Sequence, residues 1–230
     1  MSAGADAAGA GSDAADAADG AAPGRRAAWA RGLLAAFAVA VLADLGSLAA
    51  GADSGHMIAK PLLMPLLAAY AAVRGAPRTL VVALLLGWGG DVFLLAGADW
   101  AFMAGMGCFA AGHVCYLALF RRGRTSRALG AGYAAALVAT VALLWPGLPA
   151  GLRVPVAGYS LLLTLMALRA GATGLCAGLG GALFLLSDTL IATGVAGWPQ
   201  LPAPGFWVML TYAAAQYLLV TGVLGRRETA

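Results

Sequence analysis

Eight long apolar segments dominate this 230-residue chain. Only 10% of its residues are charged, against roughly 25% in soluble domains, and its mean hydropathy is +0.86. A helix crosses the hydrocarbon layer of a membrane with roughly 20 residues, and it satisfies all its backbone polar groups internally. We therefore predict an all-α, multi-pass membrane protein with eight transmembrane helices, at residues 29–50, 57–73, 78–96, 101–120, 128–145, 152–169, 173–195 and 206–224.

Residues 1–24 have a different composition. They contain Ala, Gly, Ser and four Asp, with no large apolar side chain after Met1. Such a segment buries too little surface to offset its ordering entropy, and it lacks the basic start and apolar stretch of a signal peptide. We expect a disordered cytoplasmic tail over residues 1–24, followed by an eight-helix transmembrane domain over residues 25–227.

The arginines predict the orientation of the helices. With the N-terminus inside, twelve of the 14 basic residues fall in cytoplasmic loops or ends, Arg153 falls outside and Lys60 lies within a segment. Cytoplasmic loops of membrane proteins carry such an excess of positive charge. Both termini are therefore predicted to be cytoplasmic, and we expect the protein in the cell membrane.

A faint internal repeat relates the third and seventh segments. Residues 90–97 read GDVFLLAG and residues 187–194 read SDTLIATG. Four segments separate the two motifs, so both helices run in the same direction, as a parallel four-plus-four duplication would require. Chance similarity between apolar segments explains the match as well.

Several classes of site are not indicated. The basic residues form no patch with interleaved aromatics, which argues against a nucleic-acid partner. The three cysteines, Cys108, Cys115 and Cys176, lie in apolar segments with no zinc or redox spacing. We expect no metal and no other cofactor, and the sequence does not indicate an oligomeric state.

Polar side chains interrupt the apolar segments at depth. Charges inside a membrane are costly, so they usually face the protein interior and mark a site. At a rise of 1.5 Å per residue, most of these groups lie in the outer half of the bilayer, roughly 5 to 18 Å from its outer face. A purely structural role, such as neutralising a neighbour or joining two helices, stays open for each of them. The candidates are Lys60, Asp91, His113 and Asp188, with Asp44, Tyr116, Ser187, Tyr212 and Gln216 in support.

Five motifs resemble the successive signatures of the YhhN family, between about residues 33 and 224. They read Lys60-Pro-Leu-Leu-Met-Pro-Leu, Gly87-Trp-Gly-Gly-Asp91, Gly112-His-Val-Cys-Tyr116, Leu186-Ser-Asp-Thr-Leu190 and Tyr212-Ala-Ala-Ala-Gln-Tyr217. The resemblance implies eight membrane spans and a hydrolase that cleaves the vinyl ether bond of lysoplasmalogens, a class of lysophospholipid, to a fatty aldehyde and glycerophospho-ethanolamine or -choline. The family's polar positions map onto Lys60, Asp91, His113, Asp188 and Gln216.

Hydrolysis of a vinyl ether needs one protonated acid and one nearby anion. The acid protonates the outer alkene carbon, and the anion stabilises the oxocarbenium ion that water then captures. Two carboxyl groups in a water-poor site can divide these roles, because burial and mutual repulsion keep one of them protonated. We hypothesise that Asp91 and Asp188 form this pair, and the sequence does not say which is the acid.

Three other functions fit parts of the pattern. A small-molecule or lipid transporter, or a flippase, would also place polar residues at depth. An intramembrane aspartyl protease uses two membrane aspartates, but Trp88 stands where its Gly-x-Gly-Asp signature needs glycine. A non-catalytic scaffold would tolerate removal of both Asp91 and Asp188 without loss of any activity.

Overall fold

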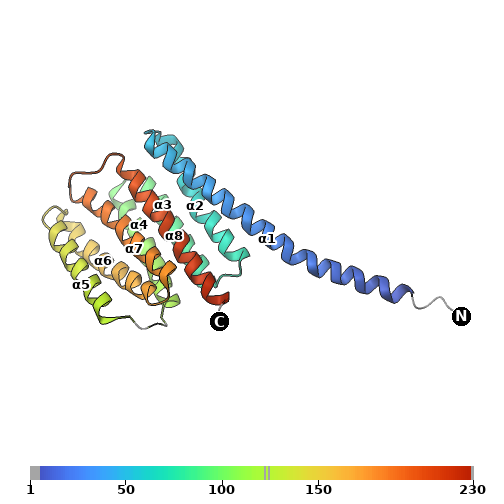
Figure 1. Cartoon of the computed structure of the whole chain (residues 1–230). Coiled ribbons are helices and arrows are strands. Elements are labelled where there is room, and N and C mark those ends of the chain that lie inside the picture. Colours follow the sequence, from blue (N-terminus) through green and yellow to red (C-terminus); the bar gives the residue numbers. More distant parts are fainter. Residues whose placement is uncertain (1–5, 122, 124, 229–230) are drawn as a thin grey trace.

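The computed structural model describes residues 6–121, 123 and 125–228, which are almost entirely helical (Figure 1). Each of the eight described helices contains a stretch that is long and apolar enough to cross a membrane, which confirms the predicted number of spans. The elements are α1 (Asp6–Ala49), α2 (Asp53–Val73), α3 (Arg78–Leu95), α4 (Asp99–Leu119), α5 (Arg127–Leu144), α6 (Ala150–Gly171), α7 (Leu175–Val195) and α8 (Pro204–Glu228).

Seven helices form a closed ring of packing neighbours. In order around the ring they are α1, α2, α3, α4, α6, α7 and α8, and α8 packs back against α1. Helix α5 stands outside this ring, against α6 and more lightly against α7, and it lies at the edge of the bundle in Figure 1. Ring closure therefore places the first and the last helix of the transmembrane domain side by side. The four-plus-four repeat stays a prediction.

Helix α1 extends further than the sequence suggested. Its membrane-spanning part is Gly24–Ala49, and the helix begins at Asp6; the disorder expected for residues 1–24 stays a prediction. Alanine has the highest helix propensity, and a helix that is already formed extends without a new nucleation step. Figure 1 shows this extension (blue) projecting beyond the bundle. Residues 1–5 of the expected tail lie outside the described residues.

Two prolines lie inside α2 without ending it. Pro65 has no N–H, so the carbonyl of Pro61, four residues earlier, loses its helical donor. The indole Nε1 of Trp88 on α3 donates to that carbonyl at 2.9 Å. The short second segment is therefore a continuous helix of 21 residues, and Trp88 links it to α3.

Arginine-bearing ends of two helices meet at one face of the bundle. Nη2 of Arg169, in the last turn of α6, donates to the carbonyl of Arg121 just after α4 at 2.6 Å. This contact agrees with the predicted placement of both arginines on one side of the membrane. Which side faces the cytoplasm stays a prediction.

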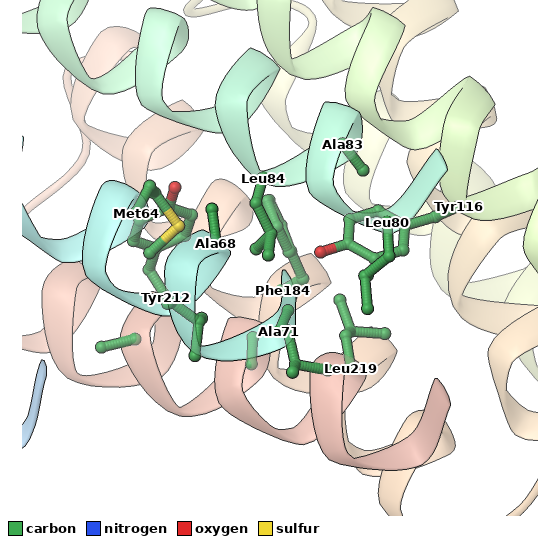
Figure 2. Close-up of a cluster of buried hydrophobic side chains, with 14 of the residues drawn as sticks. Met64, Ala68, Ala71, Leu80, Ala83, Leu84, Tyr116, Phe184, Tyr212 and Leu219 are labelled. Carbon is green, nitrogen blue, oxygen red and sulfur yellow. The ribbon is translucent and has the colours of Figure 1, made fainter. Parts of the chain in front are cut away.

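The core of the bundle consists of aliphatic and aromatic side chains. Met64, Leu80, Leu84 and Leu219 are fully buried, and Figure 2 shows them around Phe184 and the tyrosines of α4 and α8. Close helix approach makes this packing possible: a Cβ on Gly180 of α7 would lie 2.9 Å from two backbone atoms of α8. Small residues at the contacts between membrane helices allow such an approach.

Substitution of Gly180 by alanine is expected to lower the free energy of unfolding by about 1–3 kcal/mol, because the α7–α8 backbones must separate. Gly107 on α4 is the matched control, since a Cβ there meets no atom within 4 Å. Gly107→Ala should not lower the free energy of unfolding. Thermal unfolding of both variants in detergent, followed by circular dichroism, makes the comparison, and equal midpoints would contradict the close approach of α7 and α8.

Candidate functional site

Asp91 lies in a fully enclosed position on α3. Its side chain is 2% exposed. Nζ of Lys60, on α2, lies 3.9 Å from Oδ1, and the hydroxyl of Tyr212, on α8, donates to Oδ2 at 2.8 Å. A buried carboxylate needs such compensation, because its charge is otherwise unpaired in a low dielectric. Two other predicted site residues, Lys60 and Tyr212, therefore meet at the carboxyl group of Asp91.

The hydrogen bonds continue from Tyr212 into the bundle. Nε2 of Gln216 donates to the Tyr212 hydroxyl at 3.4 Å, and the hydroxyl of Tyr116 donates to Oε1 of Gln216 at 2.6 Å. Tyr116 and Gln216 are each 1% exposed. Helices α2, α3, α4 and α8 thus share one buried chain of polar groups, which we name the Asp91 network: Lys60, Asp91, Tyr212, Gln216 and Tyr116.

Asp188, on α7, belongs to a second chain. The hydroxyl of Tyr159, on α6, donates to its Oδ2, and Nε2 of His113, on α4, lies 3.0 Å from the same hydroxyl. Because the hydroxyl proton goes to Asp188, the Tyr159 oxygen accepts from His113, which assigns the imidazole proton to Nε2. Nδ1 of His113 is then an acceptor, and it is buried without a partner in the described part of the chain. We name these three residues the Asp188 network.

A cavity of about 100 Å³ adjoins the Asp188 network. Residues of α3, α4, α5, α6 and α7 line it, and its wall is mainly apolar, with Phe102, Met106 and Leu163 among the lining side chains. Asp188 is only half-buried, in keeping with its place in this wall. The polar lining residues are Thr140, Tyr159, Ser160, Thr164, Asp188 and Thr189.

Aromatic rings lie between the two networks. The ring of Phe184 contacts both His113, at 4.7 Å between centroids, and Tyr212, at 5.4 Å. Phe109 contacts Phe184 and Tyr212 and also lines the cavity. Among the described residues no hydrogen bond joins Asp91 to Asp188. The expected pair of carboxyl groups is thus held in two separate networks, and its catalytic role stays a prediction.

Two other predicted residues have different surroundings. Asp44, on α1, is fully buried. Its Oδ1 lies 2.7 Å from Nδ1 of His56, near the start of α2. Its second oxygen, Oδ2, has no hydrogen-bond partner in the described residues. The hydroxyl of Ser187 donates to the backbone carbonyl of Val208 at 3.1 Å, so it joins α7 to α8 and belongs to neither network.

Sequence reasoning missed Tyr159, His56 and Thr164. Tyrosines in membrane segments commonly lie at the lipid interface, so the residue type alone does not mark Tyr159 as part of a site. The signal that could have found it is the pair Tyr159-Ser160 in the middle of an apolar segment. Side chains of His, Cys, Asp and Glu form no group of three that could hold a metal ion, within the residues searched.

Comparison with known proteins identifies the family. The chain matches the YhhN family over residues 55–223. It is 35% identical over 196 residues to proteins named lysoplasmalogenase from Mycobacterium bovis and Mycobacterium tuberculosis, which covers 76% of this chain and 74% of each relative. It is 35% identical over 135 residues to lysoplasmalogenase TMEM86B of Homo sapiens, which covers 59% of this chain and 58% of that protein. No solved structure matches. The chain belongs to the YhhN family.

Proposed function

We propose that this protein is a membrane-embedded hydrolase that cleaves the vinyl ether bond of a lysoplasmalogen to a fatty aldehyde and glycerophospho-ethanolamine or -choline. The relatives named lysoplasmalogenase support this reaction. The observation that carries the proposal is a carboxyl group, Asp188, in the wall of an apolar cavity within the membrane domain. An alkenyl chain is apolar, and the bond to be cleaved lies where that chain joins the polar glycerol.

Asp188 is the proposed acid. Oδ2 accepts the hydrogen bond from Tyr159, which leaves Oδ1 to carry a proton. Transfer of that proton to the outer alkene carbon breaks the π bond and generates an oxocarbenium ion. Water then adds to the carbon attached to the ether oxygen and gives up a proton to the Asp188 carboxylate, which restores the acid, and the hemiacetal collapses to an aldehyde and the glycerol hydroxyl. General acid catalysis of this kind contributes roughly 10²–10⁴-fold.

Asp91 is the proposed anion. Lys60 and Tyr212 both stabilise its ionised form, and it does not line the cavity. A negative charge fixed in a region of low dielectric favours a cation that develops nearby. In this division of roles only one carboxyl group exchanges a proton with the substrate, and the other acts through the electrostatic field.

Mass spectrometry of purified protein with two substrates tests the proposal. Incubation with a lysoplasmalogen should release a fatty aldehyde. Incubation with an acyl lysophospholipid of the same chain length should release neither aldehyde nor fatty acid, because an ester is not opened by protonation of an alkene carbon. Absence of aldehyde from the first substrate would refute the function. The transporter alternative has no support among the relatives, which are named as enzymes.

Replacement of Tyr159 by phenylalanine is expected to lower kcat about tenfold, with little change in KM. The variant removes the hydroxyl that orients the protonated Asp188 and accepts from His113, and a hydrogen bond between neutral groups contributes up to about 1.5 kcal/mol. Tyr133→Phe on α5 serves as the control, because Tyr133 does not line the cavity. Unchanged kcat in Tyr159→Phe would remove the Asp188 network from the mechanism.

A further inference from the structure

Asp44 is a buried carboxyl group that the proposed mechanism does not use. It lies in the membrane-spanning part of α1 and is fully buried. Its Oδ1 lies 2.7 Å from Nδ1 of His56, and its Oδ2 has no hydrogen-bond partner in the described residues. A carboxylate at such a depth is costly unless a partner neutralises it. His56 is the side chain that the structure pairs with Asp44.

His56 and Lys60 stand on the same face of α2. They are four residues apart, which places two helical side chains one turn from each other. From this face they pair with different neighbouring helices. His56 reaches Asp44 on α1, which packs along α2 (Figure 1), and Nζ of Lys60 lies 3.9 Å from Oδ1 of Asp91 on α3. Helix α2 therefore carries two basic side chains, each of them opposite a carboxyl group.

The two pairs are not independent. Lys60 interacts electrostatically with Asp44 as well as with Asp91, and the two carboxylates repel each other. One ammonium group balances only one carboxylate, and neither Asp44 nor Asp91 is more than 2% exposed to solvent that could screen it. Without a positive charge on His56, Asp44 would compete with Asp91 for Lys60. The imidazolium form of His56 removes this competition, because the four groups then carry two charges of each sign.

We propose that His56 is a positioning residue of the hydrolase: as an imidazolium it neutralises Asp44, which leaves the Lys60 ammonium at Asp91. This inference rests on the proposed function, in which Asp91 supplies a fixed negative charge. A buried carboxylate that loses its counter-ion takes up a proton and is no longer an anion. His56 does not line the cavity, so it acts on the reaction through Asp44 and Lys60 and not by contact with the substrate.

Removal of the positive charge tests this role. His56→Gln keeps a hydrogen-bond donor for Asp44 but carries no charge. It should lower kcat for aldehyde release from a lysoplasmalogen about tenfold, with little change in KM, as expected when a unit charge moves by a few ångströms at intermediate dielectric. His56→Gln combined with Asp44→Asn should restore kcat to nearly the wild-type value, because Lys60 then has a single carboxylate to neutralise.

Ser47→Ala is the matched control at the same contact between α1 and α2. Ser47 is uncharged, its hydroxyl donates to the carbonyl of Ala43 on its own helix, and it packs against Gly55 beside His56. This variant should keep the wild-type kcat. Unchanged kcat in His56→Gln would overturn the inference. A double variant as impaired or as unstable as His56→Gln would also overturn it, because the loss would then come from packing. Wild-type protein that releases no aldehyde would refute the proposed function itself, and with it the ground for this inference.

Discussion

Conversion of Asp188 to asparagine should reduce the rate of aldehyde release from a lysoplasmalogen by about 10³-fold, within the range for loss of a general acid. The amide still accepts the hydrogen bond from Tyr159, but it has no acidic proton to give to the alkene carbon. The expected change is therefore in kcat, with binding of the lipid largely preserved. Single-turnover measurements in detergent, with aldehyde quantified by mass spectrometry, separate the rate of the chemical step from binding of the lipid.

Asp99→Asn is the control for this experiment, because Asp99 is an exposed carboxylate at the start of α4. It should retain full activity. Asp188→Asn with more than a tenth of the wild-type rate would exclude Asp188 as the acid. Comparison with Asp91→Asn tests the paired-carboxyl hypothesis: both variants should be impaired, and full activity in Asp91→Asn would leave Asp188 to act without an anionic partner.

Loss of Lys60 should have the largest effect on stability. Lys60 is 8% exposed and Asp91 2%, so Lys60→Met leaves an uncompensated charge in the core. Breaking a buried ion pair from one side typically costs about 3–5 kcal/mol. We expect this loss in the free energy of unfolding, measured by denaturation in mixed micelles.

A double variant separates the unpaired charge from lost packing. Lys60→Met combined with Asp91→Asn removes both charges and keeps an acceptor for the Tyr212 hydroxyl. It should recover more than half of the stability lost in Lys60→Met, although it is expected to be inactive. Arg78→Met, at an exposed position in the first turn of α3, is the control, and it should lower the free energy of unfolding by less than about 0.5 kcal/mol. If the double variant were no more stable than Lys60→Met, the ion pair would not be the cause.

Part of the site could be predicted from the sequence. The position of each residue in its segment predicts Lys60, Asp91, Tyr212 and Gln216 in the same half of the bilayer, and the structure joins them in one network. Depth along a helix follows from a fixed rise per residue. The direction in which each side chain points depends on how the helix rotates against its neighbours, and no local pattern determines that rotation in nearly uniform apolar segments.

Tyr159 and Phe184 illustrate this limit. Phe184 does not differ in the sequence from ordinary aromatic residues of a membrane protein, and only the neighbouring Ser160 sets Tyr159 apart from them. Tyr159 gains its importance only because α4, α6 and α7 meet, which places its hydroxyl between His113 and Asp188. Phe184 matters because its ring lies between His113 and Tyr212 and so separates the two networks.

The number of spans and the presence of costly polar groups inside them were determined by the sequence alone, because the bilayer acts on each segment by its length and polarity and requires every backbone group to be bonded within it. The closure of seven helices into a ring, the position of α5 outside it and the division of Asp91 and Asp188 between two networks were decided only by the tertiary structure. These features depend on which helix faces fit together at close range, as Gly180 fits against α8, and lipid offers no hydrophobic preference between one apolar face and another.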